Sequence, residues 1–408
     1  MPGSNPGPLA GTRVVDLSSN APGPFCTMVL GDLGAEVIAV HQPDSARSAA
    51  RLEALRATGG EATDEPFPAL RGGPSDTLGR NKRSIGINLK DTRGLELFHS
   101  LVADADVLVE EMRPGTADRL GVGYEAMHEL NPRLVYCSIS GFGQDGPYAS
   151  LPGHDLSYLA QTGALAMLTP RGAGPVIPQN IVADYAGGGL VAAVGVLAAL
   201  LARQRTGVGQ HVDAALTDGV LYVLADLLSS WFGFAVTPEL GESAVSGALP
   251  GYSVYETRDG HHLAIACLEP WFFRALCDAV GRPELTPLFS EPGRRDEVRS
   301  ELAAVFATRT RDEWFAILAG ADVAVGRVLG LEELATDPQL QARNMIIDVA
   351  RSEGPPVRMV GVAPKLSDTP GSVRSAPFHR GRDTDAILAE LGVHDGELAE
   401  LRARGAIA

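Results

Sequence analysis

The segment RVVDLSSNAPGPFCTMVLGDLGAEVIAVHQP, residues 13–43, decides the fold class of this chain. Residues 13–18 and 36–43 are rich in β-branched side chains, so both predict short buried strands. A turn at 20–24 and a helix over 26–34 lie between them. Strand, helix and strand in this order are typical of the opening of a doubly wound α/β domain. The turn lacks the GxGxxG pattern, which disfavours a dinucleotide site.

The same alternation continues along the chain. SIGINL (84–89), DVLVEEM (106–112) and LVYCSISGFG (134–143) predict further strands, and 94–105 has helical apolar spacing. We therefore expect one parallel sheet through about residue 150. Farther on, the apolar runs over 187–203 and 211–234 predict two long helices.

A second domain begins after a Pro-, Gly- and Ser-rich break at 238–251. Residues 252–267 alternate around a DG turn, which predicts a hairpin. We expect a large α/β domain over 1–237 and a small α+β domain over 252–330. Residues 331–408 have too little apolar mass to stand alone, so we expect them to pack back onto the large domain. Residues 44–79 have no strand pattern and predict a surface insertion, with a mobile lid as the alternative.

The net charge of −16 over 408 residues disfavours nucleic acid or an anionic membrane as the main partner. An anionic ligand would need a local basic patch. The segment RNKRSIGINLKD (80–91) supplies four cations against one carboxylate, and it predicts a polyphosphate site. The alternative is a solvated charge cluster at a strand end.

Several features point to a cytoplasmic protein without a membrane span or a metal. The N-terminus, residues 1–11, lacks the pattern of a signal peptide, and the apolar run 190–202 is too short to span a bilayer. The four cysteines are scattered, without a CxxC pair or a metal-ligand cluster, and predict buried free thiols: Cys26, Cys137, Cys267 and Cys277.

Three residues are candidates for proton transfer. His154 precedes a predicted helix, Asp184 lies in the glycine-rich VADYAGGG segment, and Glu269 precedes a Pro-initiated helix. Each has a structural alternative, because His154 could cap a helix or fill the core and Asp184 could be an N-cap. Glu269 could have no role in catalysis and merely complement a helix dipole. GxSxG, HExxH and P-loop patterns are absent, which disfavours serine hydrolases, zincins and P-loop enzymes.

Motifs spread over nearly the whole chain resemble those of the family III CoA-transferase superfamily, and most closely its α-methylacyl-CoA racemase branch. The motifs are GDLGAEVIAV, NKRSIGINLKD, RPGTADRLGVGY, GFGQDGPY, GHDLSYLAQTG, VADYAGGGL, RTGVGQHVDAALTDG and CLEPWFF. The resemblance implies a large Rossmann-like doubly wound domain with a smaller α+β domain. It also implies an interlocked homodimer.

The resemblance implies an enzyme that interconverts (R)- and (S)-2-methylacyl-CoA thioesters by moving the α-proton. His154 and Asp184 would face each other across the α-carbon, and Glu269 would hydrogen-bond Asp184 from the same or the partner chain. Backbone N–H groups around Asp155 would hold the enolate oxygen. In the transferase branch the Asp is instead a nucleophile that forms acyl-anhydride and thioester intermediates. The presence of all three residues favours a racemase.

The same resemblance implies no permanently bound cofactor, because CoA arrives as part of the substrate. One departure stands out, since Gln42 occupies a position at which the family usually has a CoA-contacting Arg. The implied CoA-binding positions are Gln42, Ile87, Asn88, Leu89, Lys90, Glu111, Met112, Arg113, Arg119, Gly153, His154, Asp155, Leu156, Ser157 and Tyr158.

Overall fold

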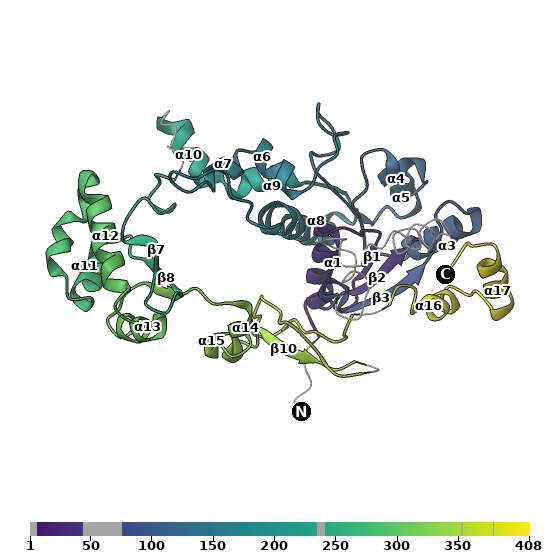
Figure 1. Ribbon diagram of the computed structural model, residues 1–408. Helices are drawn as coiled ribbons and strands as arrows, with labels where there is room; N and C mark the ends of the chain where they lie inside the picture. The colour runs from purple at the N-terminus through teal and green to yellow at the C-terminus, as the bar shows by residue number, and fades with distance from the viewer. Residues whose placement is uncertain (1–5, 44–75, 235–240, 352–353, 378) are drawn as a thin grey trace, which may run out of the picture. The chain divides into compact units, whose positions relative to one another are not determined.

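The protein is described by a computed structural model that covers residues 6–43, 76–234, 241–351, 354–377 and 379–408. The chain forms two compact units (Figure 1). The first contains residues 1–161, 179–223 and 338–408, and the second contains 162–178 and 224–337. The predicted large domain, 1–237, also included 162–178 and 224–234, which the structure groups with the second unit. The predicted insertion at 44–79 lies outside the described residues except for 76–79.

The first unit is built on a six-stranded sheet in which every neighbouring pair is parallel. The strand order is β3-β2-β1-β4-β5-β6, which confirms the predicted doubly wound α/β fold. The order reverses between β1 and β4, so a crevice opens there at the carboxyl ends of the strands. The strands are β1 (Arg13–Asp16), β2 (Glu36–His41), β3 (Lys82–Gly86), β4 (Val107–Glu110), β5 (Val135–Ser140) and β6 (His211–Ala215).

Helices cover both faces of this sheet. The core on one face joins strand side chains to α3, α5, α16 and α17, and Figure 1 shows α16 and the C-terminus beside β3. On the other side, α1 contacts α8 and the π-helical segment η2. The helices of this unit are α1 (Pro22–Asp32), η1 (Thr77–Gly79), α3 (Thr92–Ala103), α4 (Thr116–Arg119), α5 (Tyr124–Leu130), α6 (Asp155–Gln161), η2 (Ile181–Leu190), α8 (Val191–Thr206), α9 (Leu216–Val223), α15 (Pro338–Ala342), α16 (Thr384–Glu390) and α17 (Asp395–Ala403).

The prediction of one long helix over 211–234 was wrong, because this stretch contains β6, α9 and α10. Helix α8 ends at Gly207, whose φ of +76° suits a residue without Cβ. Gly209 then passes so close to β5 that a Cβ there would lie 1.9 Å from the carbonyl oxygen of Leu134. Two glycines thus turn the chain back along the sheet edge, where tertiary pairing overrides the apolar pattern.

The second unit has its own core around a three-stranded antiparallel sheet, ordered β7-β8-β9. The predicted hairpin is present as β7 and β8, with Gly260 at φ +75° in the turn. The elements are α7 (Ala164–Met167), α10 (Ala225–Phe234), β7 (Tyr252–Glu256), β8 (His262–Ala266), α11 (Pro270–Ala279), η3 (Pro283–Ser290), η4 (Pro292–Arg294), α12 (Arg295–Phe306), α13 (Arg311–Ala319), β9 (Val325–Arg327) and α14 (Leu331–Leu334).

The C-terminal segment from residue 338 belongs to the first unit. It includes a two-stranded antiparallel ribbon, β10 (Ile346–Val349) and β11 (Val357–Val360). Arg374 secures the segment by donating to the carbonyls of Gly31 and Ala35 at the end of α1, at 2.8 and 2.9 Å. All four cysteines are buried free thiols, as predicted.

In the part of the chain that the structure describes, one helix is long and apolar enough to cross a membrane by length and composition. It is the continuous run Ile181–Thr206, formed by η2 and α8. The helix contacts β5, β6, α1 and α9. The core helix of a soluble protein meets the same two criteria, so this finding gives no sign of a membrane protein.

Candidate active site

A cavity of about 480 Å³ opens at the point where the strand order reverses. The loops after β1, β4 and β5 form its floor, and the starts of α6 and η2 form its wall. Two of the three candidate catalytic residues, His154 and Asp184, line it together. Its other lining residues include Asn20, Pro22, Glu111, Met112, Arg113, Ser140, Gly141, Gly153, Ser157, Tyr158 and Leu216.

His154 stands immediately before α6. Its carbonyl oxygen, rather than its ring, closes the first turn by accepting from the N–H groups of Ser157 and Tyr158, at 2.8 and 3.3 Å. The side chain is exposed toward the cavity, so His154 is not a core histidine. The N–H groups of Asp155 and Leu156 have no acceptor among the described residues, as expected of the first donors of a helix.

Asp155 joins the two walls of the cavity. Its buried carboxylate accepts from the backbone N–H groups of Ala183 and Asp184, both at 2.8 Å. Burial raises the pKa of Asp155, while these two N–H groups favour its ionised form and oppose the shift. The side chain therefore fixes the start of η2, and with it Asp184, against the start of α6. The predicted contact between the Asp155 backbone N–H and the enolate oxygen stays a prediction.

Asp184 lies in the first turn of η2 and is not its N-cap, which is Asn180. Asn180 donates its side-chain amide to the Asp184 carboxylate at 3.1 Å. Asn180 was not among the predicted site residues, and its polar side chain four positions before Asp184 was the available signal.

The glycines after Asp184 accommodate the protein's own helices. A Cβ on Gly187 would come within 2.9 Å of the backbone of α9, and one on Gly189 within 2.8 Å of the carbonyl oxygen of Pro22 in α1. These contacts explain why the segment is glycine-rich without a ligand at its backbone.

Tyr158 fills the base of the cavity. Its ring lies so near the backbone that a Cβ at Gly141 or Gly153 would approach it to 2.4 or 2.6 Å. Burial raises the pKa of the Tyr158 hydroxyl; Asp184 adds to the rise and Arg113 opposes it. The charges of Asp184 and Arg113 therefore both act on the Tyr158 hydroxyl.

Glu111 shapes the loop after β1. Its carboxylate accepts from the backbone N–H groups of Ser19, Asn20 and Gly23, the first at 2.5 Å and the last at 3.1 Å. Burial raises the pKa of Glu111 to about 7 against the effect of these donors. The neighbouring Arg113 is exposed at the cavity and makes no ion pair with a described residue.

The predicted basic patch at 80–91 is wrong as a polyphosphate surface, because three of its four cations are paired with carboxylates of the protein, two of them in the core. Arg80 binds Asp32, and Lys82 binds Asp16 at 3.0 Å, with all four side chains at most 6% exposed. Arg83 bridges Glu36 and Glu390.

The remaining positions that the resemblance implies for CoA lie outside this cavity. Ile87 and Leu89 are buried in the core, and Asn88 bonds to the backbone of residues 405–406. Gln42 and Lys90 are exposed, and Arg119 donates to the hydroxyl of Thr116. Contact of these residues with CoA stays a prediction.

Glu269 belongs to the second unit, so the structure describes it apart from His154 and Asp184. It is the N-cap residue of α11, its side chain makes no capping bond, and its carbonyl accepts from Phe273 at 3.1 Å. Across the described residues no group of three or more His, Cys, Asp or Glu side chains could hold a metal ion.

Comparisons with known proteins identify the family of this chain. The profile described as CoA-transferase family III matches residues 9–384. The chain is 35% identical to the α-methylacyl-CoA racemase of Homo sapiens, over 96% of each chain. It is also 34% identical to the beta subunit of succinyl-CoA–L-malate CoA-transferase from Chloroflexus aurantiacus, over 98% of each. A crystal structure of a CAIB/BAIF family protein from Brucella suis superposes with a TM-score of 0.79 at 30% identity, covering 95% of this chain and all of that one.

Proposed function

The chain belongs to CoA-transferase family III, and we propose that it is a racemase that interconverts the (R) and (S) epimers of a 2-methylacyl-CoA thioester. One observation carries the proposal: an exposed imidazole and a carboxylate, His154 and Asp184, line one cavity from two separate helix starts. The similarity to a racemase over 96% of the chain supports the same choice.

Inversion at an α-carbon needs two acid/base groups, one on each face of the carbon. An unprotonated base removes the α-proton from one face and leaves an enolate, and a protonated acid returns a proton to the other face. Histidine suits this role because its ordinary pKa is close to neutral pH. A carboxyl group suits it when its environment keeps a proton available. His154 and Asp184 would exchange these roles between the two directions of the reaction.

Two further parts of the site would stabilise the enolate oxygen and hold the Asp184 carboxyl group. The N–H groups of Asp155 and Leu156, which lack acceptors among the described residues, would donate to the enolate oxygen at the start of α6. Asn180 holds the Asp184 carboxylate through its amide. We propose that Glu269, from the same chain or from a partner, shares a proton with Asp184 during the reaction.

A CoA-transferase is the second candidate, because several relatives at similar identity carry transferase names. In that reaction the Asp184 carboxylate would attack the thioester carbonyl, forming a mixed anhydride and releasing CoA as a thiolate. The thiolate would then attack the Asp184 carbonyl, giving an aspartyl-CoA thioester and releasing the donor carboxylate. An acceptor carboxylate would attack this thioester to form a second anhydride, and the released thiolate would attack its acceptor carbonyl, giving the new CoA thioester and free Asp184. The same cavity can house either reaction, so chemistry rather than shape must separate them.

Incubation of one epimer of a 2-methylacyl-CoA in D₂O separates the two reactions. A racemase will introduce deuterium at the α-carbon and epimerise it without any acceptor acid. The result that would contradict the proposal is the absence of α-exchange across straight-chain, branched and aryl-substituted acyl-CoAs. Hydroxylamine adds an independent measurement, since it will trap the anhydride of a transferase and leave a racemase active.

We also propose that the enzyme is a cytoplasmic homodimer. The continuous helix formed by η2 and α8 exposes a stripe of apolar side chains at Leu190, Val194 and Leu201, with the last two 65% and 62% exposed. An apolar stripe of this kind typically marks an interaction surface. Light scattering will test the dimer, and Val194→Asp with Leu201→Asp is expected to shift it toward monomer.

A further inference from the structure

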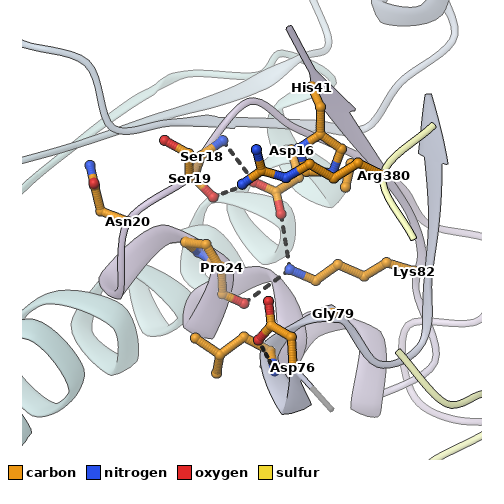
Figure 2. Close-up of a pocket in the computed structure, with 12 residues that line it drawn as sticks. Asp16, Ser18, Ser19, Asn20, Pro24, His41, Asp76, Gly79, Lys82 and Arg380 are labelled. Atoms are coloured by element: carbon orange, nitrogen blue, oxygen red, sulfur yellow. Dashed lines mark hydrogen bonds and ion pairs between the residues drawn. The ribbon is translucent and has the colours of Figure 1, made fainter. Parts of the chain in front are cut away.

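A second, smaller cavity lies at the carboxyl ends of β1 and β2 (Figure 2). It is lined by polar side chains from four parts of the first unit, including Asp16, Asn20, His41, Lys82 and Arg380. Arg380 comes from the C-terminal segment, far from the others in sequence. The catalytic scheme proposed above uses none of these side chains.

Two of the charges in this cavity satisfy each other. Lys82 donates to the Asp16 carboxylate at 3.0 Å and to the hydroxyl of Thr27 at 2.7 Å. Asp16 also accepts from Thr27 at 2.5 Å. The side chains of Asp16 and Lys82 are each 2% exposed, so this pair is part of the core. Lys82 is therefore committed and cannot serve as the cation for a ligand.

Arg380 differs, because it makes no ion pair or hydrogen bond with any residue the structure describes. Its segment is nevertheless fixed in place. Gly381 donates to the hydroxyl of Ser84 at 2.9 Å, and Asp383 both accepts from and donates to the Ser84 backbone, at 2.8 and 2.9 Å. The neighbouring Arg382, by contrast, is paired with Asp383. The segment thus holds one uncommitted guanidinium over the strand ends, where Figure 2 shows it beside Asp16 and His41.

The two cavities lie on either side of one short loop. Asn20 lines both of them, and its loop is fixed from each side. Glu111 accepts from the N–H groups of Ser19 and Asn20, and Asp16 accepts from the N–H of Ser18 at 2.9 Å. Asn20 therefore borders both the cavity of His154 and Asp184 and the cavity of Arg380.

We propose that Arg380 binds a phosphate group of the nucleotide end of the CoA thioester whose acyl end lies between His154 and Asp184. This inference rests on the proposed acyl-CoA chemistry and adds the residue that recognises the distal anion. A guanidinium matches phosphate geometry and pairs with it through two parallel hydrogen bonds. Gln42, exposed at the end of β2, carries no charge that could do this. In a chain of net charge −16, a cation held at this position favours the entry of a polyanion.

Calorimetric titration of CoA and of 3′-dephospho-CoA into the intact protein tests the proposal. Arg380→Gln is expected to weaken CoA binding by about tenfold, corresponding to one charge-assisted contact, and more strongly at low salt. Arg382→Gln removes an equal charge from the same segment and is expected to leave affinity unchanged. Adding Gln42→Arg to Arg380→Gln should restore part of the loss, because it returns a cation to the end of β2.

The two CoA forms locate the contact. A loss confined to CoA assigns Arg380 to the 3′-phosphate, and an equal loss for both forms assigns it to the diphosphate. If the wild-type protein binds CoA and Arg380→Gln binds it equally well, the inference fails and the proposed function stands. If the wild-type protein binds neither form and shows no α-exchange, the proposed function fails and the inference with it.

Discussion

Asp16 and Asp184 are two carboxylates of the same unit with opposite surroundings. Asp16 is buried, and Lys82, Ser18 and Thr27 all donate to it. Burial alone would raise the pKa of Asp16, but Lys82 and these donors outweigh it and lower the pKa below its ordinary value. Asp184 is half-buried, accepts from the neutral amide of Asn180 and faces a cavity of about 480 Å³.

The difference shows how one fold separates a carboxylate that stabilises the structure from a carboxylate that can take part in proton transfer. A buried carboxylate with a committed cation keeps one protonation state, which serves stability and forbids proton transfer at neutral pH. A carboxylate beside neutral donors and open space can change its protonation state during a reaction. Substitution of Asp184 should therefore change the reaction rate, and disruption of the Asp16–Lys82 pair should change the free energy of unfolding.

The largest effect is expected from Asp184→Asn. Asparagine keeps the shape and the contact with Asn180 but cannot accept a proton, so epimerisation should fall by up to about 10⁴-fold, the range of a positioned acid/base group. His154 remains, so α-exchange should persist for one epimer only. Chiral analysis of both epimers in D₂O measures this. The thermal midpoint is expected to change little, and equal loss of exchange from both epimers would contradict separate faces for the two residues.

The next largest effect concerns stability. Lys82→Met removes the cation and leaves Asp16 buried without its charge partner, which is expected to lower the free energy of unfolding by about 3–5 kcal/mol. Urea denaturation followed by circular dichroism measures the change.

Two controls sharpen this result. Adding Asp16→Leu to Lys82→Met removes both charges and should recover much of the loss. Arg358→Met breaks the pair with Asp348 on the exposed β10–β11 ribbon and should cost less than about 1 kcal/mol. A loss no larger for Lys82→Met than for Arg358→Met would show that the buried pair is not structural.

The sheet could be predicted from sequence, because parallel strands buried on both faces are continuous apolar runs separated by helical patterns. β6 could not, since HVDAA is short and merges with the apolar helix that follows. Its pairing with β5 depends on a close approach at Gly209 that only the tertiary structure reveals.

The candidate site was predictable to a different degree. His154 and Asp184 were predicted from sequence and the structure places both at one cavity, while their catalytic role stays a prediction. The basic residues at 80–83 were misjudged because a local excess of cations does not show distant carboxylates such as Asp16, Asp32 and Glu390. Asp155 was expected to act through its backbone, and its side-chain role depends on a contact 28 residues away.

A smaller effect is expected from Asp155→Ala, which removes the acceptor that fixes the backbone of Asp184. Displacement of the carboxylate by about 1 Å would lower the epimerisation rate by about 10²-fold. Loss of the two hydrogen bonds should also cost about 1 kcal/mol of stability. Asp155→Asn keeps an oxygen that can accept these bonds and should recover most of the rate, measured as kcat at saturating thioester. Equal rates for Asp155→Ala and Asp155→Asn would show that the Asp155 side chain does not position Asp184.

The smallest effect is a pH dependence of the stability, which arises at His41 in the same cavity as Asp16. Burial, with a contribution from Arg380, lowers the pKa of His41 to about 4. Between an ordinary histidine pKa of about 6.5 and this value the unfolded chain binds the extra proton, so stability present above pH 6.5 is lost as the pH falls toward 4. We expect this group to account for on the order of 2 kcal/mol of that loss. Urea midpoints at pH 7 and pH 5 measure it, and His41→Gln should flatten the difference. An unchanged pH dependence in that variant would assign the loss to other groups, of which His211, with a pKa also lowered by burial, is the first to test.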